Sequence, residues 1–265
     1  MSPLGRMVSS SDGTPIHYDV YGSGAPALVF VHGWCCNRSY WDRQVQPFAQ
    51  RHTVVVLDLA GHGASGRDRT TYSLPLFGQD VVAVVEHLDL SHIVLIGHSM
   101  GGPVIVEAAR RMPTRVVGLV GVDTWHDLSL QRTPAQVEER LTPFRAHFVE
   151  AAQQFVRTMF LPSSDPVLLE SVLAGMTAAP PHVGLGALEA VTGSDQLQQE
   201  GFRALAAPRL AINAAGWRQT NRAAAQEFGL EVHCMAGVGH FVMMEDAPTF
   251  NRLLDEAIHR FTGAR

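Results

Sequence analysis

The amino-acid sequence predicts an α/β protein whose mostly parallel central sheet is flanked by helices, with a helical cap inserted over one end. Three observations predict this class. Short, nearly continuous runs of Val, Ile and Leu recur along the chain, as expected of strands buried on both faces. Segments with apolar residues at helical spacing separate these runs. A proline-rich stretch, between about residues 128 and 203, interrupts the alternation.

Six apolar runs are the predicted strands of this sheet. They lie at residues 27–31, 53–57, 92–96, 116–122, 208–212 and 230–235. Helical spacing is clearest in the segments 76–88 and 250–261, where the apolar residues fall on one side. Strand and helix therefore alternate through most of the chain, which favours a sheet covered by helices on both faces.

The interrupted stretch is predicted to form a cap. We expect residues 1–127 and 204–265 to build the core domain and residues 128–203 to build the helical cap or lid. Within the cap, Phe144, Phe148 and Phe155 fall on one helical face. Such a stripe either packs the cap onto the core or lines a substrate pocket, and some of its residues do both.

Composition excludes several functions. The 265 residues carry a formal charge of −5, without a Lys/Arg cluster that would attract nucleic acid. The chain has no signal-like start and no uninterrupted apolar stretch of about 18 residues, so we expect no membrane association and a cytoplasmic location. Its three cysteines and thirteen histidines lack metal-ligand spacing, and we expect neither disulfides, metal nor cofactor.

The segment Gly97-His98-Ser99-Met100-Gly101 carries the strongest chemical signal. It matches G-x-S-x-G between a predicted strand and a predicted helix. The sharp turn there forces the serine into unusual backbone angles and requires neighbours without side chains. Free N–H groups at the start of the helix point toward any anion formed at the serine. Ser99 is therefore the predicted nucleophile.

A serine hydroxyl needs a base, and His240 is the predicted one. It lies in the glycine-flanked loop Gly237-Val238-Gly239-His240-Phe241, after the last strand and before the last helix. That loop is expected at the same sheet edge as Ser99. His32 and His62 also follow strands and are the alternatives.

These motifs together resemble the α/β-hydrolase family, in a serine esterase or lipase-like form. The family order matches His32-Gly33-Trp34, then Asp58 with the glycine loop 61–66, then GHSMGG at 97–102, then GVGHF at 237–241. The resemblance implies a catalytic triad in the order serine, acid, histidine. It also implies an oxyanion hole formed by the backbone N–H groups of Trp34 and Met100.

The acid departs from the commonest pattern of that family. Members often carry it after the strand matching residues 208–212, where this chain continues with Asn213 and no carboxylate. Other members take the acid from the end of the preceding strand, and here Asp123 directly follows residues 116–122. Asp123 is therefore the predicted acid, with Asp127 and a structural role for both as alternatives.

Two other features receive structural interpretations. Residues 61–66 match the dinucleotide fingerprint G-x-G-x-x-G, but the polar, proline-ended segment that follows does not begin a helix. We expect a tight loop ordered by Asp58. Cys35 and Cys36 lack a histidine-containing thiol motif and are expected to be small buried side chains.

The sequence thus predicts a serine esterase acting on small, largely apolar carboxylic esters through an acyl-enzyme. Trp125, Phe144, Phe148 and Phe241 are its predicted pocket residues. One alternative keeps the triad for carbon–carbon bond hydrolysis, lactone opening, thioester cleavage or cofactor-free perhydrolysis. Another is a slow-turnover ligand sensor, because a fold alone does not select a reaction. The oligomeric state and the acyl chain length are left open.

Overall fold

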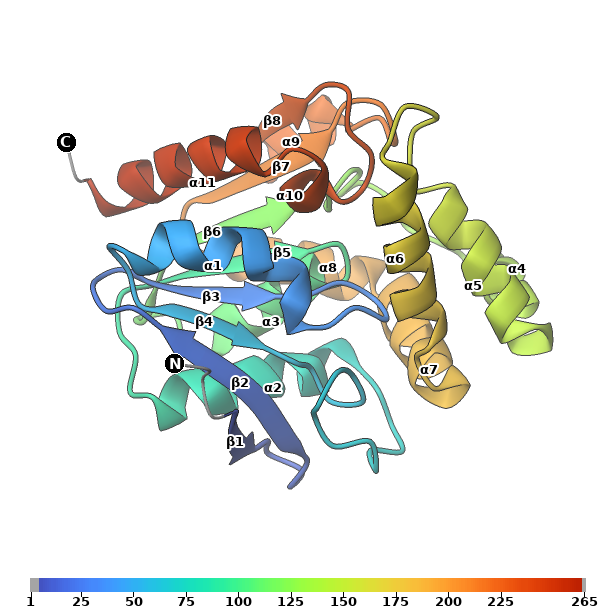
Figure 1. Ribbon diagram of the computed structural model, residues 1–265, viewed down its shortest axis with the longest axis horizontal. Coiled ribbons are helices and arrows are strands. Elements are labelled where there is room, and N and C mark those ends of the chain that lie inside the picture. Colours follow the sequence, from blue (N-terminus) through green and yellow to red (C-terminus); the bar gives the residue numbers. More distant parts are fainter. Residues whose placement is uncertain (1–4, 264–265) are drawn as a thin grey trace.

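The centre of the molecule is an eight-stranded sheet, whose strands Figure 1 shows running side by side from β1 at the bottom to β8 at the top, among the surrounding helices. The structure is a computed structural model that describes residues 5–263. In chain order the strands are β1 (Arg6–Ser9), β2 (Pro15–Tyr21), β3 (Ala27–Val31), β4 (Val54–Leu57), β5 (Ile93–His98), β6 (Val116–Val122), β7 (Arg209–Ala214) and β8 (Glu231–Met235). Their spatial order is β1-β2-β4-β3-β5-β6-β7-β8. The predicted α/β class is confirmed.

The six strands β3 to β8 are parallel, and they correspond to the six predicted runs. Every residue of β3, β4 and β5 is buried, which explains their unbroken apolar sequences. The strands β1 and β2, at one margin of the sheet, pair antiparallel with their neighbours and are partly exposed. Their mixed composition gives no apolar run, so the sequence pattern did not single them out.

Helices cover both faces of the sheet. On one face lie α1 (Asp42–Ala49) and α11 (Ala247–Thr262), with the short α10 (Val242–Glu245) beside them. On the other face lie α2 (Leu74–His87) and α3 (Gly101–Arg111). Two short elements, the 3-10 turn η1 (Arg38–Trp41) and α9 (Arg222–Glu227), complete the core. The predicted alternation of strand and helix therefore produces three layers.

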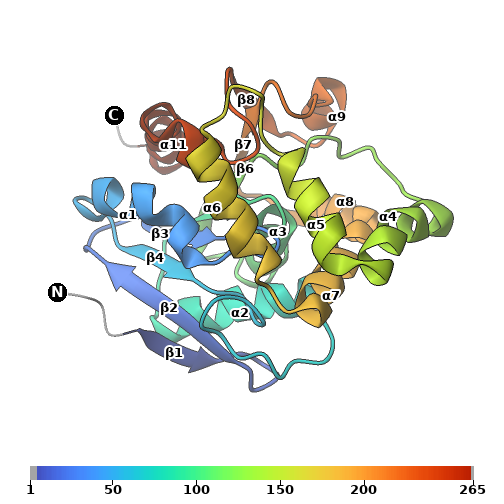
Figure 2. The ribbon, with the colours of Figure 1, turned by 45° about the vertical axis from the view of Figure 1, so that its right-hand side comes forward.

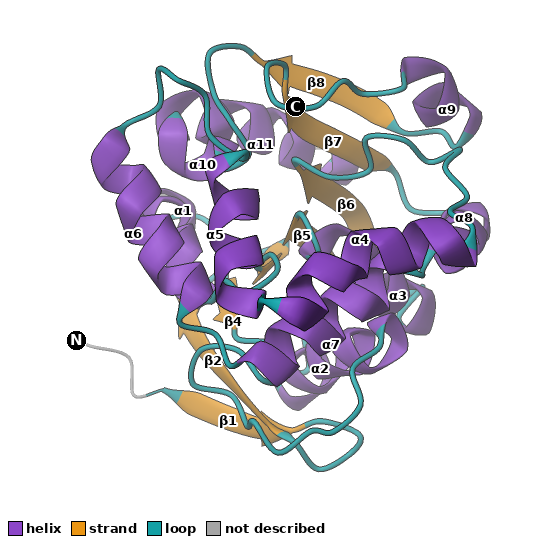
Figure 3. Cartoon of the chain, turned by 90° about the vertical axis from the view of Figure 1, so that its right-hand side faces the viewer, coloured by secondary structure: helices purple, strands orange, loops and turns teal. Residues whose placement is uncertain are grey.

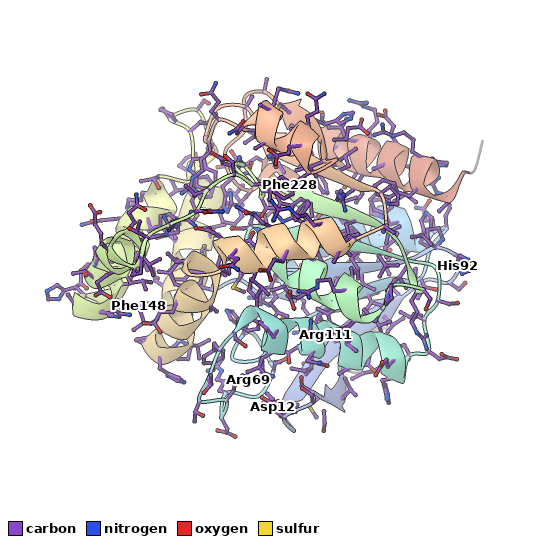
Figure 4. The ribbon with its side chains drawn as sticks, turned by 180° about the vertical axis from the view of Figure 1, so that it is seen from behind. Asp12, Arg69, His92, Arg111, Phe148 and Phe228 are labelled. Carbon is purple, nitrogen blue, oxygen red and sulfur yellow. The ribbon has the colours of Figure 1, made fainter. Side chains whose placement is uncertain are left out.

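Four helices form the cap over the carboxyl ends of the parallel strands, which Figure 3 shows facing the viewer. They are α4 (Pro134–Ala146), α5 (Phe148–Arg157), α6 (Pro166–Thr177) and α7 (Pro181–Thr192), and Figure 2 shows them side by side. The chain then returns through α8 (Asp195–Ala204), which packs against α3 on the core, as Figure 4 shows from behind. Within residues 5–263, no helix combines the length and apolar character needed to cross a lipid bilayer.

The aromatic stripe of the cap does not lie on one helix, as its spacing predicted. The chain breaks at His147, whose φ of −145° is extended, so Phe144 belongs to α4 while Phe148 and Phe155 belong to α5. Pro143, near the end of α4, lacks an N–H and weakens the continuation of a helix. The three rings nevertheless gather around Trp34, with ring centroids 5.7 to 5.9 Å from its ring.

Candidate active site

Ser99 occupies a strained turn between β5 and α3. Its φ is +53°, a left-handed conformation that costs a residue with a side chain energy and that surrounding contacts must maintain. Those contacts are close: a Cβ on Gly97 would lie 2.3 Å from the carbonyl oxygen of Gly101, and one on Gly101 would lie 2.5 Å from that of Val31. Both glycines are therefore required sterically, and the hydroxyl projects at the carboxyl edge of the sheet.

Two backbone N–H groups beside Ser99 have no acceptor within residues 5–263. They belong to Met100, at the start of α3, and to Trp34, in the loop after β3. Gly33 allows this loop to approach, because a Cβ there would lie 2.8 Å from a ring nitrogen of His98. The geometry leaves both donors available to an oxygen of a bound ligand.

His240 and Asp123 are joined by a short hydrogen bond. The Nδ1–H of His240 donates to Oδ2 of Asp123 at 2.5 Å, and both side chains are buried. Asp123 directly follows β6 with a φ of +44°, and its Oδ1 accepts from the N–H of Ala214 at 2.7 Å. This contact with the end of β7 fixes the carboxylate where the imidazole needs it.

The environment sets the protonation of this pair. Burial alone would raise the pKa of Asp123, but the imidazole of His126, 3.6 Å away, and the hydrogen bond from His240 outweigh it and hold that pKa well below its usual range. Burial lowers the pKa of His240 below its ordinary value, despite the opposing hydrogen bond and charge of Asp123. The imidazole is therefore neutral at neutral pH and available as a base, while Asp123 is ionised.

Asn213 stands where the commonest members of the family carry their acid. Its Oδ1 accepts from the N–H of Thr124 at 3.1 Å, and its Nδ2 donates to Thr220 at 3.0 Å. Asn213 therefore orders the turn that presents Asp123. The alternative acid Asp127 is exposed, and its Oδ1 accepts from Ser129 and Asn221 instead of from His240.

The loop that carries His240 is clamped to the segment between α5 and α6. The N–H of His240 donates to the carbonyl of Met159 at 2.7 Å. Glu245 joins the same two segments, because it accepts from the N–H of Gly239 at 3.0 Å and from the hydroxyl of Ser164 at 2.6 Å. We call these contacts the cap clamp. The position of the imidazole thus depends on the cap as well as on the core.

Aromatic neighbours hold the ring of His240. The ring of Trp217 lies 4.1 Å from it between centroids, and the buried ring of His98 lies 4.6 Å away. The Nε2–H of His98 also donates to the carbonyl of His240 at 3.1 Å. The residue before the nucleophile therefore positions the histidine as well as filling space.

Two cavities meet at Ser99 and His240, and both residues line both cavities. The polar cavity has a volume of about 210 Å³ and opens toward charged side chains. These are Asp127, Arg132, Arg140, Asp195 and Arg218. The apolar cavity has a volume of about 70 Å³. The residues that line it and not the polar cavity are Trp34, Cys36, His98, Met159, Met176 and Phe241. No hydrogen bond joins the Ser99 hydroxyl to His240, so the two face each other across shared cavity space.

The structure separates the four aromatic residues predicted for the pocket. Trp125 lines the polar cavity and Phe241 lines the apolar one. Phe144 and Phe148 line neither; they pack against Trp34 from the cap, and Figure 4 shows Phe148 among the cap helices. Phe155, the third ring of the stripe, lines both cavities.

The site residues that were not predicted include Arg140, Trp217 and Arg218. The sequence neighbours of Arg140 are mostly polar, as is typical of a solvent-exposed helix, so no local pattern indicates that it lies in a site. Trp217 and Arg218 follow β7, and this location was a usable signal, since loops after parallel strands gather at one sheet edge.

The alternative histidines and the glycine loop have structural roles. His32 donates from Nδ1 to the carbonyl of Gly33 and accepts at Nε2 from the N–H of Leu59, so both nitrogens are engaged. His62 is buried, and burial lowers its pKa to about 3. Asp58 accepts from the N–H of Ala64 at 2.9 Å within the glycine loop, and the next helix begins only at Leu74.

The remaining candidate groups are also accounted for. Cys35 and Cys36 are free and buried, and burial raises the pKa of both thiols. Between residues 5 and 263, no group of three or more His, Cys, Asp or Glu side chains is arranged to hold a metal ion.

The mostly parallel sheet flanked by helices and the strained turn at Ser99 after β5 are the features of an α/β-hydrolase fold. Comparison with known proteins agrees, because a family model described as "alpha/beta hydrolase fold" matches residues 26–174. The chain therefore belongs to the α/β-hydrolase fold family.

Among curated proteins, the chain is 31% identical over 254 residues to a dihydrolipoyllysine-residue acetyltransferase component of an acetoin cleaving system from Cupriavidus necator, covering 92% of this chain and 66% of that protein. It is 41% identical over 96 residues to a non-heme haloperoxidase from Rhodococcus erythropolis, covering 36% and 35% of the two chains. The matches thus span less than two thirds of these relatives.

A solved structure described as Est816, an N-acyl homoserine lactone degrading enzyme, is similar over almost its whole length. It is 28% identical to this chain with a TM-score of 0.77, and the match covers 95% of this chain and 99% of that one.

Proposed function

We propose that this protein is a serine hydrolase that cleaves carboxylic esters of small molecules through an acyl-enzyme. The observation that carries the proposal is the convergence of a strained, accessible serine with a histidine held at 2.5 Å by a buried carboxylate. The hydroxyl of Ser99, the imidazole of His240 and the carboxylate of Asp123 form the proposed catalytic triad.

In the proposed mechanism, His240 accepts the proton of Ser99 as the serine oxygen attacks the ester carbonyl. The carbonyl oxygen becomes an oxyanion, which accepts hydrogen bonds from the N–H groups of Trp34 and Met100; one such donor contributes about 3 kcal/mol. His240 then protonates the departing alcohol. Water, deprotonated by His240, attacks the acyl-enzyme and releases the acid and free Ser99.

The role of Asp123 in this mechanism is electrostatic. Its negative charge stabilises the imidazolium that forms when His240 takes the serine proton, and its hydrogen bond keeps Nδ1 protonated so that Nε2 faces the cavity. The apolar cavity excludes water from one part of the substrate, which strengthens both effects.

Lactone opening is the second candidate. A lactone is a cyclic ester and reacts through the same steps, and the structure of Est816, named for degrading an N-acyl homoserine lactone, is similar over 95% of this chain. Parallel assays of open-chain esters and lactones decide between them.

The decisive experiment combines covalent labelling with turnover. A fluorophosphonate is expected to label Ser99, as mass spectrometry of the labelled peptide would show. Ser99→Ala is expected to lose labelling and to reduce p-nitrophenyl ester hydrolysis by about 10⁴-fold or more. Labelling of another residue contradicts the proposal, and a single slow turnover per molecule favours a ligand sensor.

A further inference from the structure

We propose that the substrate carries a carboxylate, which binds between Arg140 and Arg218 in the polar cavity while the uncharged part enters the apolar cavity. This inference rests on the proposed ester hydrolysis and specifies its substrate class. The largely apolar substrate predicted from the sequence matches the lining of the apolar cavity but not that of the polar cavity.

Arg140 reaches the site from α4 and lines both cavities. Its guanidinium lies 5.5 Å from the centroid of the Phe155 ring, and it has no hydrogen-bond acceptor among residues 5–263. Burial, together with the positive charges of Arg218 and Arg132, lowers the pKa of Arg140 to about 10, so it stays cationic at neutral pH. The side chain is therefore a partly desolvated cation with unused donors.

Arg218 reaches the polar cavity from the loop after β7. Its guanidinium lies 4.4 Å from the centroid of the Trp217 ring, which also contacts the ring of His240. It also has no hydrogen-bonded acceptor within the described residues. Stacking on an aromatic ring orders a guanidinium while leaving its N–H groups directed outward.

The carboxylates that line the polar cavity are committed elsewhere. Asp123 is bonded to His240 and Ala214. Asp195 accepts from the backbone N–H of Arg132 at 2.7 Å and from its guanidinium at 2.5 Å. Asp127 accepts from Ser129 and Asn221. These carboxylates offset the positive charges of Arg132, Arg140 and Arg218, which line the same cavity. None of the three carboxylates accepts a hydrogen bond from Arg140 or Arg218.

An anionic ligand group would supply the missing acceptor. A carboxylate matches the planar fork of a guanidinium and forms charge-assisted hydrogen bonds, about twice as strong as neutral ones. Because Ser99 and His240 lie where the two cavities meet, an ester anchored at Arg140 and Arg218 presents its carbonyl to Ser99 and its uncharged chain to the apolar cavity. The two guanidiniums thus act as an orienting anchor.

The test uses two pairs of esters that differ in one carboxylate. The first pair, mono-p-nitrophenyl adipate and p-nitrophenyl hexanoate, places the charge on the acyl side. The second pair, 4-(hexanoyloxy)benzoate and its benzamide analogue, places it on the alcohol side. The kcat/KM of each ester is measured for the wild type, Arg140→Met, Arg218→Met and Ser99→Ala. Arg145→Met is the matched control, because Arg145 lies on the same helix and pairs with Glu138 and Glu189 outside both cavities.

We expect the wild type to favour the charged ester in one pair, which also identifies the half that carries the charge. Arg140→Met is expected to lower kcat/KM for that ester by about 10- to 100-fold, and to lower it far less for its neutral partner. Arg218→Met is expected to act in the same direction and Arg145→Met to change neither ester.

Two results would overturn the inference while the proposed hydrolysis stands. One is Ser99-dependent hydrolysis with a preference for the neutral ester in both pairs. The other is an equal loss on charged and neutral esters in Arg140→Met. Absence of Ser99-dependent hydrolysis of all four esters would instead contradict the proposed function itself, and this inference with it.

Discussion

The polar and apolar cavities share the side chains of Ser99 and His240 but surround them differently. The polar cavity, about 210 Å³, is walled by α4, α8 and the loop after β7. The apolar cavity, about 70 Å³, is walled by the loop after β3, the end of α5 and α6. The polar cavity gathers several charged side chains, whereas the apolar cavity is lined mainly by apolar ones, and Arg140 lines both. In the proposed function, the shared Ser99 and His240 carry out the reaction, while the residues that differ between the cavities select the substrate.

The strongest test of this comparison is Asp123→Asn. Because Asp123 acts through His240, which lines both cavities, the substitution is expected to lower kcat by about 10³- to 10⁴-fold for every ester, whichever cavity it fills. Asparagine tolerates the positive φ of this position, so the fold is expected to survive. Steady-state kinetics on charged and neutral esters measure the loss, with circular dichroism as a check on folding.

Asp127→Asn is the matched control for this prediction. The side chain is exposed and makes no contact with His240, so we expect activity within about threefold of the wild type. A larger loss in Asp127→Asn than in Asp123→Asn would show that the acid has been assigned wrongly.

A smaller, selective effect is expected from filling the apolar cavity. Met176 on α6 lines this cavity and not the polar one. Met176→Phe is expected to lower kcat/KM for p-nitrophenyl hexanoate by about tenfold while the acetate ester loses less, because the added ring occupies space that a long chain needs. The measurement is a series of esters of increasing acyl length.

Met176→Leu conserves volume and serves as the control. It is expected to keep the wild-type order of chain lengths. If Met176→Phe lowers kcat/KM by the same factor for esters of every acyl length, the apolar cavity does not hold the acyl chain. The proposed difference between the two cavities would then be wrong for the apolar cavity.

The smallest expected effect concerns pH. His240 must be neutral to accept a proton, and burial lowers its pKa below the ordinary 6.5, so the acid limb of kcat/KM is expected to have its midpoint below 6.5. At pH 6.5 the enzyme should therefore keep more than half of its plateau rate. Rate profiles for one charged and one neutral ester test this, and a midpoint above 7 would contradict it.

The two substrates sharpen the comparison further. Since the same imidazole serves both cavities, the two profiles are expected to share one acid limb once the ester's own carboxylate is fully ionised. Separate limbs would mean that a second titrating group controls one of the reactions.

The sequence predicted the centre of this fold more completely than its margins. Buried parallel strands leave unbroken apolar runs, and all six correspond to strands of the sheet. The antiparallel strands β1 and β2 leave no such run, because both are partly exposed to solvent. The break at His147 was also missed, since an aromatic stripe continues across two helices as readily as along one.

The candidate site follows the same division. Ser99, His240 and Asp123 stand beside strand ends, so the order of strands sufficed to propose them together, and the structure brings His240 and Asp123 into contact. Arg140 and the cap rings lie on helices whose placement depends on tertiary packing. Periodicity alone did not distinguish Phe155, which faces the cavities, from Phe144, which packs behind Trp34.

The cap clamp has a consequence for attempts to redesign this protein. If the cap touched the core only through side chains, it could be replaced by the cap of another protein, and the substrate selectivity would change with it. Here the peptide N–H of His240, the proposed general base, donates to the carbonyl of Met159, in the segment between α5 and α6. We therefore expect a chimera that replaces residues 158–164 to displace His240 along with the walls of the pocket. A graft that retains this segment is expected to leave His240 in position.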